Sequence, residues 1–284
     1  MPELQGALAD RVHGARAVVF DMDGTLVLGD SSNAGHRPLP GAVELLALLR
    51  RRGIPFRIFT NGTAKVPAVY AGILRHAGLD VHDEEMMTPS SVAADWFRRR
   101  RIRRIRVLGL DGVQGPLREA GLEIVGPAEP AAGVEAVFTG WFREFTFPDL
   151  EAACRDVWAG AILTTASNVP FFATQGGRAI GASFAINAML RAMTGRRARV
   201  LGKPSGTALR CAVRMMGLPG VACAHTVVIG DDPALEMRMA RSAGALALAV
   251  TTGLSSRDDF TRAGAAAAPN AVLDGLGPLV ALFS

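Results

Sequence analysis

The 284-residue sequence has few cysteines, few aromatic residues and no long apolar segment. Its three cysteines, Cys154, Cys211 and Cys223, are odd in number and far apart, which argues against a disulfide framework and against a CxxC-type zinc site. No run reaches the roughly 18 uninterrupted apolar residues of a membrane span. Charged residues interrupt the first twenty positions, so no signal peptide is predicted. We therefore expect a cytoplasmic globular protein without a membrane partner.

Positive charge is concentrated in one arginine-rich segment, residues 98–106. The arginines of this segment alone carry more positive charge than the net charge of +5. Such a run can indicate a nucleic-acid surface. The preceding residues 91–97 have a helical pattern, however, and arginines at the end of a helix face the negative end of its dipole. The segment also lacks interleaved aromatic residues that could stack on bases. We interpret it as the solvated end of a helix, which argues against a nucleic-acid partner and leaves an anionic partner or an oligomer surface as the alternative.

Apolar periodicity predicts alternating strands and helices at both ends of the chain. The predicted strands span residues 17–20, 56–59, 226–229, 245–250 and 271–273. The predicted helices span residues 41–52, 66–77 and 233–243. Strands that alternate with helices pair in parallel through right-handed crossovers. Both ends of the chain are therefore expected to build one mainly parallel α/β sheet.

The middle of the chain contains a second alternating stretch. Its predicted strands span residues 105–108, 136–138 and 161–163, and its predicted helices lie near 116–120 and at 148–158. This stretch is long enough to form a domain of its own. We predict a discontinuous core of residues 1–81 and 197–284, with an inserted α/β domain at 82–196. Ligands of open α/β sheets bind beyond the carboxyl ends of the strands, which is where we expect the insertion.

Polar side chains follow the predicted core strands directly. Asp21 and Asp23 follow the first strand, Thr60 follows the second, Asp231 follows the 226–229 strand, and Lys203 precedes a predicted helix. Each alone has a simpler explanation, such as a turn, a helix cap or a solvated lysine. Because neighbouring parallel strands end at the same edge of a sheet, we expect the five side chains to share one crevice.

Three carboxylates, a hydroxyl and an ammonium suit a site for Mg²⁺ and a phosphoryl group. Mg²⁺ takes a few carboxylates and fills its other positions with water and substrate phosphate. Lys203 supplies a point charge, and Thr60 and nearby backbone amides supply hydrogen bonds to phosphoryl oxygens.

The polar segments resemble, in order, the four motifs of the haloacid dehalogenase (HAD) superfamily. The matching segments are Asp21-Met22-Asp23-Gly24-Thr25, Thr60-Asn61, Lys203-Pro204 and Gly230-Asp231 through Glu236. The long insertion resembles the type-two cap of the NagD-like phosphatase branch. The resemblance covers nearly the whole chain and implies a Rossmann-like core with an inserted α/β cap.

The resemblance also implies a role for each motif residue. Asp21 would attack phosphorus and form an aspartyl-phosphate, and Asp23 would protonate the leaving alcohol and then activate water. Mg²⁺ would be held by the carboxylates of Asp21 and Asp231 and by the carbonyl of Asp23. The implied phosphate-binding residues are Thr60, Asn61, Gly62 and Lys203, and the residues that would orient these groups are Glu236 and Asp232.

These features predict a Mg²⁺-dependent phosphatase that hydrolyses the phosphate monoester of a small metabolite. The alternatives are a phosphotransferase or mutase on the same fold, and a non-catalytic protein that binds a phosphorylated ligand or nucleic acid. The sequence leaves the oligomeric state open, a homo-oligomer included.

Two segments depart from the pattern of the branch. Residues 29–37 form a longer loop than expected, and His36 within it is interpreted as a solvated loop histidine. In the cap, residues 166–172 stand where the branch often has Thr-Asn-Pro-Asp. The candidate specificity residues are Asn168, Phe171, Phe172 and Arg178, with packing in the cap core as the alternative for the two phenylalanines.

Overall fold

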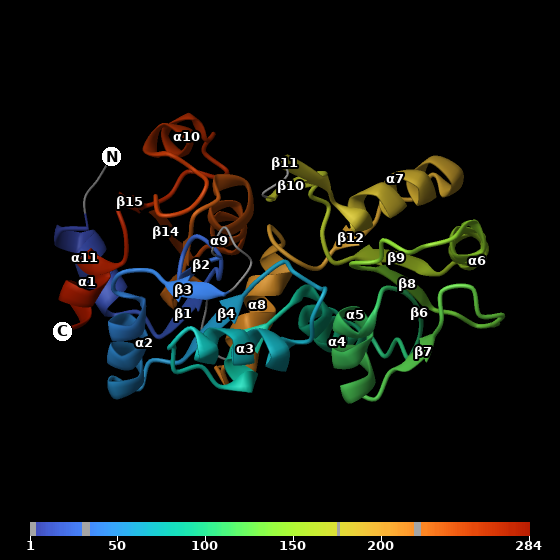
Figure 1. The fold of residues 1–284 in the computed structure, drawn as a ribbon, viewed down its shortest axis with the longest axis horizontal. Helices are drawn as coiled ribbons and strands as arrows, with labels where there is room; N and C mark the ends of the chain where they lie inside the picture. The colour runs from blue at the N-terminus through green and yellow to red at the C-terminus, as the bar shows by residue number, and fades with distance from the viewer. Residues whose placement is uncertain (1–3, 30–34, 175–176, 219–222) are drawn as a thin grey trace. The chain divides into compact units, whose positions relative to one another are not determined.

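The computed structural model describes residues 4–29, 35–174, 177–218 and 223–284, and the chain divides into two compact units (Figure 1). The first unit comprises Met1–Thr60, Ala68–Met87 and Lys203–Ser284, and the second comprises Asn61–Pro67 and Thr88–Gly202. The borders at 87/88 and 202/203 differ from the predicted 81/82 and 196/197. The assignment of core and cap domains stays a prediction.

The first unit contains a six-stranded sheet in the order β15-β14-β13-β1-β4-β5, with every neighbouring pair parallel. Its strands are β1 (Ala17–Phe20), β4 (Phe56–Phe59), β5 (Met86–Met87), β13 (Thr226–Gly230), β14 (Leu246–Val250) and β15 (Ala271–Leu273). All residues of these strands are buried, as expected for parallel strands covered on both faces. A short antiparallel ribbon, β2 (Val27–Gly29) with β3 (His36–Pro38), follows β1.

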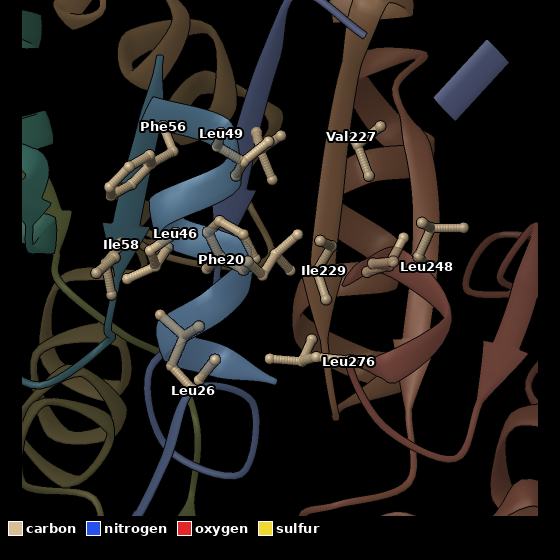
Figure 2. Close-up of a cluster of buried hydrophobic side chains, with 14 of the residues drawn as sticks. Phe20, Leu26, Leu46, Leu49, Phe56, Ile58, Val227, Ile229, Leu248 and Leu276 are labelled. Atoms are coloured by element: carbon tan, nitrogen blue, oxygen red, sulfur yellow. The ribbon is translucent and has the colours of Figure 1, made fainter. Parts of the chain in front are cut away.

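Helices flank this sheet and bury their apolar faces. They are α1 (Gly6–His13), α2 (Ala42–Arg51), α3 (Pro67–His76), α8 (Gly206–Met215), α9 (Arg238–Ala243), α10 (Arg257–Arg262) and α11 (Gly277–Phe283). Figure 2 shows Leu46 and Leu49 of α2 beside Phe20 of β1 and Phe56 of β4, within one buried apolar cluster. Burial of each large side chain stabilises the fold by about 1.5–3 kcal/mol. Val43 of α2 lies outside this cluster and is 42% exposed.

The strand register brings the ends of the central strands to one edge of the sheet. Phe20 of β1 is paired with Ile229 of β13 on one side and with Ile58 of β4 on the other. The residues that follow these three strands therefore emerge at the same edge. This alignment, fixed by apolar packing, places Asp21 and Asp231 near one another.

The second unit has its own parallel sheet, in the order β12-β9-β8-β6-β7. Its strands are β6 (Arg104–Leu108), β7 (Glu123–Val125), β8 (Ala136–Thr139), β9 (Ile162–Thr165) and β12 (Arg199–Val200). Its helices are α4 (Pro89–Arg99), α5 (Asp111–Glu119), α6 (Phe147–Trp158) and α7 (Ala182–Thr194), and an antiparallel pair is formed by β10 (Phe171–Thr174) and β11 (Gly177–Ile180). Throughout the described parts of both units, no helix combines the length and apolar character needed to cross a bilayer.

Helix α5 begins earlier than predicted and contains Pro116 in its interior. A Cβ atom on Gly112 would lie 2.4 Å from the Thr63 carbonyl oxygen, and one on Gly115 would lie 2.7 Å from a Val66 methyl group. The two glycines therefore let the segment 63–66 approach the helix backbone closely. This tertiary packing overrides the poor helix propensity of glycine and proline.

The arginine-rich segment is only partly the solvated helix end that we expected. Arg98–Arg101 are exposed at and after the end of α4, but Arg104 and Arg106 belong to β6. The Arg106 side chain is buried, and its Nε lies 2.5 Å from Asp156 Oδ2. Its Nη1 donates to the carbonyl oxygens of Gly126, Pro127 and Glu129. Arg106 is thus a buried structural cation, and the prediction of a solvated side chain was wrong there.

We predict that Arg106→Leu destabilises the second unit by about 3–5 kcal/mol, because Asp156 keeps a buried charge without its partner. The three tryptophans of the chain all belong to this unit, so urea unfolding followed by their fluorescence reports its stability. Arg118→Leu is the control, since Arg118 pairs with the exposed Asp111 at 3.8 Å and such pairs contribute about 0–1 kcal/mol. Equal losses in the two variants would contradict a special role for the buried pair.

Candidate active site

The Asp21–Thr25 segment forms a tight turn directly after β1. The Gly24 amide donates to the Val27 carbonyl at 2.8 Å, and the Val27 amide donates to the Met22 carbonyl at 3.1 Å. Gly24 has φ +81°, a conformation that favours glycine. The turn holds the Asp21 carboxylate in a buried position and leaves the Asp23 carboxyl more exposed, with side-chain exposures of 10% and 57%.

A buried lysine lies against the Asp21 carboxylate. Lys203 is 2% exposed; its Nζ contacts Asp21 Oδ1 and lies 2.6 Å from Glu236 Oε1. The face of the Phe59 ring lies 5.6 Å from the same ammonium. Burial lowers the pKa of Lys203, but the charges of Asp21 and Glu236 outweigh this effect, so the net shift of the pKa is upward. Lys203 therefore remains a cation at neutral pH.

Glu236 is placed by an irregular turn at the start of the helix that follows β13. Residues Pro233–Met237 form a π-helical turn, capped by the Asp232 side chain, which accepts a hydrogen bond from the Ala234 amide at 2.7 Å. Glu236 Oε2 accepts from the Asp232 amide at 3.1 Å. A Cβ atom on Gly230 would lie 2.3 Å from Glu236 Cγ, so this glycine gives the carboxylate room. Burial raises the pKa of Glu236 to about 8, although Lys203 opposes the rise.

Asp231 is held by a segment after β14 that the sequence did not single out. Its Oδ2 accepts a hydrogen bond from the Leu254 amide at 3.0 Å. A Cβ atom on Gly253 would lie 1.8 Å from the same oxygen, and the Thr252 hydroxyl donates to the Gly24 carbonyl at 2.6 Å. The only sequence signal for this support is a Gly after two Thr. Burial, and then the charge of Asp21, raise the pKa of Asp231 to about 6.

The carboxylates near Asp21 suit a hard cation that needs only a few protein ligands. Besides the effect of burial, the charge of Asp21 raises the pKa of Asp23, Asp231 and Glu236, so Lys203 alone does not neutralise the cluster. Within the part of the chain that the structure describes, no three His, Cys, Asp or Glu side chains form a metal site by themselves. Mg²⁺ does not need a complete set of protein ligands, because it uses one or two carboxylates and keeps several waters.

Asp23 contacts the histidine that we interpreted as a solvated loop residue. His36 Nε2 lies 3.4 Å from Asp23 Oδ1, and the His36 side chain is 26% exposed. Partial loss of water and the charge of Asp21 raise the pKa of Asp23, whereas His36 and Lys203 oppose the rise. The solvated interpretation of His36 was therefore wrong. Positions 30–34 of the same loop lie outside the described residues.

The predicted phosphate-binding residues are divided between the units. Thr60 is buried in the first unit, and its amide donates to the Met87 carbonyl at 3.3 Å. Asn61 and Gly62 belong to the second unit, where the Asn61 side-chain oxygen lies against Gly202. The structure therefore groups Thr60 with the carboxylates and Lys203 in one unit, and it leaves the roles of Asn61 and Gly62 as predictions.

The candidate specificity residues belong to the second unit. Asn168 is exposed and Phe171 is 46% exposed, so Phe171 is not part of a packed core. The side chains of Phe172 and Arg178 lie outside the described residues. The specificity roles of all four stay predictions.

Two family models match the chain, and each covers part of the candidate site. A haloacid dehalogenase-like hydrolase model matches residues 18–123, which include Asp21, Asp23 and Thr60. A HAD-hydrolase-like model matches residues 200–279, which include Lys203 and Asp231. The chain belongs to the haloacid dehalogenase-like hydrolases.

Relatives of this HAD-like hydrolase are similar over most of their length. Mouse chronophin is 28% identical over 263 residues, covering 89% of this chain and 86% of its own. The ribonucleotide monophosphatase NagD of Escherichia coli is 27% identical over 243 residues, covering 86% and 90%. A glycerol phosphate phosphatase of Mycobacterium tuberculosis, solved in complex with calcium, is 25% identical with a TM-score of 0.80, covering 96% and 76%.

These similarities confirm three predictions from the sequence. The HAD-like chain has the predicted α/β fold, it resembles the NagD-like branch, and it is a hydrolase of the phosphatase class. A divalent metal is typical of phosphatases in this family, in agreement with the charge of the carboxylate cluster.

We predict that Gly253→Ala lowers the phosphatase activity of this HAD-like chain by about 10²-fold, because the new methyl group displaces the Asp231 carboxylate by about 1 Å or more. Gly275→Ala is the matched control, since its Cβ would meet Thr252 Cγ2 at an ordinary 3.5 Å. Steady-state assays and circular dichroism of both variants test this. Full activity of Gly253→Ala would show that the position of Asp231 is unimportant.

Proposed function

We propose that this protein is a Mg²⁺-dependent phosphatase that hydrolyses a small phosphate monoester through an aspartyl-phosphate on Asp21. One observation carries the proposal: the buried Asp21 carboxylate contacts Lys203 at the sheet edge that also holds Asp231, in a chain of the HAD-like hydrolases. The names of the relatives support a small phosphorylated substrate. A cytoplasmic location remains a prediction from the sequence.

In the first step, a carboxylate oxygen of Asp21 bonds to phosphorus while the bond from phosphorus to the ester oxygen breaks. The bonding pair stays on the departing oxygen, and Asp23 gives it a proton. In the second step, Asp23 takes a proton from water, and the water oxygen bonds to phosphorus. The bond between Asp21 and phosphorus then breaks, which releases inorganic phosphate and restores both aspartates.

We assign the metal to the carboxylates of Asp21 and Asp231 and the carbonyl of Asp23. When bound, Mg²⁺ offsets the repulsion between the anionic nucleophile and the anionic phosphate. Lys203 supplies a further positive charge. Glu236 holds Lys203 in place, and the Asp232 amide in turn holds Glu236, through the contacts described above. We also assign phosphoryl binding to Thr60, Asn61 and Gly62.

We propose that the second unit selects the leaving group through Asn168, Phe171, Phe172 and Arg178. The exposure of Asn168 and Phe171 supports a binding role over a packing role. The differing names of the relatives, a ribonucleotide monophosphatase and a glycerol phosphate phosphatase, agree with a selectivity that varies within one fold.

We predict that Asp21→Asn reduces hydrolysis of p-nitrophenyl phosphate in Mg²⁺ by at least about 10³-fold, because the nucleophile is lost. Asp10→Asn, in the exposed part of α1, is the matched control and should keep wild-type activity. Phosphate release is measured together with the circular dichroism spectrum of each variant. Undiminished turnover by a folded Asp21→Asn protein would overturn the mechanism.

We predict that the metal-free protein loses stability as the pH rises from about 4 to about 8. Asp231 and Glu236 have pKa values raised to about 6 and about 8, whereas unfolded carboxyls ionise near pH 4, so the folded state binds more protons in this window. Mg²⁺ competes with the proton of Asp231 and should stabilise the protein more at about pH 8 than at about pH 5.5. Calorimetry in EDTA and in Mg²⁺ measures both effects.

The matched variant for this experiment is Asp231→Asn, which should remove most of the stabilisation by Mg²⁺. Equal stabilisation of the wild type by Mg²⁺ at both pH values would contradict the assignment of the metal to the carboxylates of Asp21 and Asp231.

A further inference from the structure

We propose that His36 is a positioning residue that holds the Asp23 carboxyl in the orientation needed for proton transfer to the leaving group. This inference rests on the proposed function, in which Asp23 supplies that proton. The observation that supports it is the distance of 3.4 Å between His36 Nε2 and Asp23 Oδ1.

The backbone fixes His36 to the same turn that carries Asp23. Val27 closes this turn by accepting from the Gly24 amide, and the same residue begins β2. In the ribbon, Val27 is paired with Pro38 and Gly29 is paired with His36. Because Leu26 and Val27 are fully buried, the ribbon is anchored in the core of the first unit. The relative placement of His36 and Asp23 is therefore built into the fold.

The cross-strand partner of His36 is Gly29, which has no side chain. No heavy atom lies within 4 Å of the position that a Cβ on Gly29 would occupy, so the imidazole ring does not lie over its cross-strand partner. The ring lies instead at the carboxyl of the preceding turn.

Asp23 needs such a contact because its side chain is 57% exposed. A carboxyl with that exposure samples several rotamers, and fixing one of them costs conformational entropy. Across the parts of the chain that the structure describes, His36 is the one side chain recorded within ion-pair distance of this carboxyl. Geometric misplacement of a reacting group by about 1 Å can cost about 10²-fold in rate.

The contact also fits the chemistry of the step. His36 engages Oδ1 of Asp23, which leaves Oδ2 to carry the proton that passes to the ester oxygen. His36 itself neither gains nor loses a proton over the cycle. Its effect should therefore depend on how much the leaving group needs protonation. Alkoxide leaving groups need it strongly, and the stable p-nitrophenolate anion needs it little.

The test compares His36→Leu, which removes the contact, with His36→Gln, whose amide can restore a donor near the position of Nε2. Arg37→Leu, in the same strand and exposed, is the matched control. Wild type and variants are assayed with p-nitrophenyl, phenyl and benzyl phosphate in Mg²⁺. We expect His36→Leu to lower kcat/KM about tenfold or more on benzyl phosphate and less than about threefold on p-nitrophenyl phosphate. The comparison uses kcat/KM because this ratio reports the steps up to release of the alcohol, whereas activation of water by Asp23 is common to all three esters. His36→Gln should recover most of the loss.

In an Asp23→Asn background, His36→Leu should have no further effect, because the group that it positions is gone. Equal losses of kcat/KM on all three esters, or no loss of kcat/KM on benzyl phosphate, would overturn the positioning role while leaving the proposed phosphatase intact. A wild type that hydrolyses none of the esters would instead overturn the proposed function, and the role of His36 with it.

Discussion

The site depends on one buried cation, Lys203, held between the carboxylates of Asp21 and Glu236. Asp21 and Lys203 are 182 residues apart in the sequence, so their contact joins the two halves of the first unit. Burying one carboxylate without a partner would cost several kcal/mol, and Lys203 offsets that cost for Asp21. Burial, and then the negative charge of Asp21, still raise the pKa of Asp231. In the proposed function, the divalent metal would offset this charge.

Much of the first unit could be predicted because its strands are short, continuous apolar runs. The predicted strands at 17–20, 56–59 and 271–273 have the same bounds in the structure. The site motifs lie directly after such strands. Parallel pairing of the strands therefore predicts that the motifs lie close together. The ribbon of β2 and β3 was not predicted, since neither strand is a continuous apolar run; β3 has the sequence His36-Arg37-Pro38.

The features that were missed depend on contacts between distant segments. Gly253 supports Asp231 only because two loops meet, and a glycine after two threonines does not by itself predict this contact. Arg106 was interpreted as solvated because six arginines lie near it in sequence, yet β6 turns it into the interior, where Asp156 pairs with it. Helix α5 forms around Pro116 because its glycines pack against residues 63–66. In each case tertiary packing overrode a local pattern.

Trapping the intermediate shows whether Asp21 becomes phosphorylated. The enzyme is quenched during turnover of p-nitrophenyl phosphate and treated with borohydride, which reduces an acyl phosphate to an alcohol. Mass spectrometry of the peptides then shows which side chain has reacted. Conversion of Asp21 to homoserine, dependent on substrate, is the predicted result. Turnover that leaves Asp21 unmodified, or that modifies a different carboxylate, would contradict the mechanism.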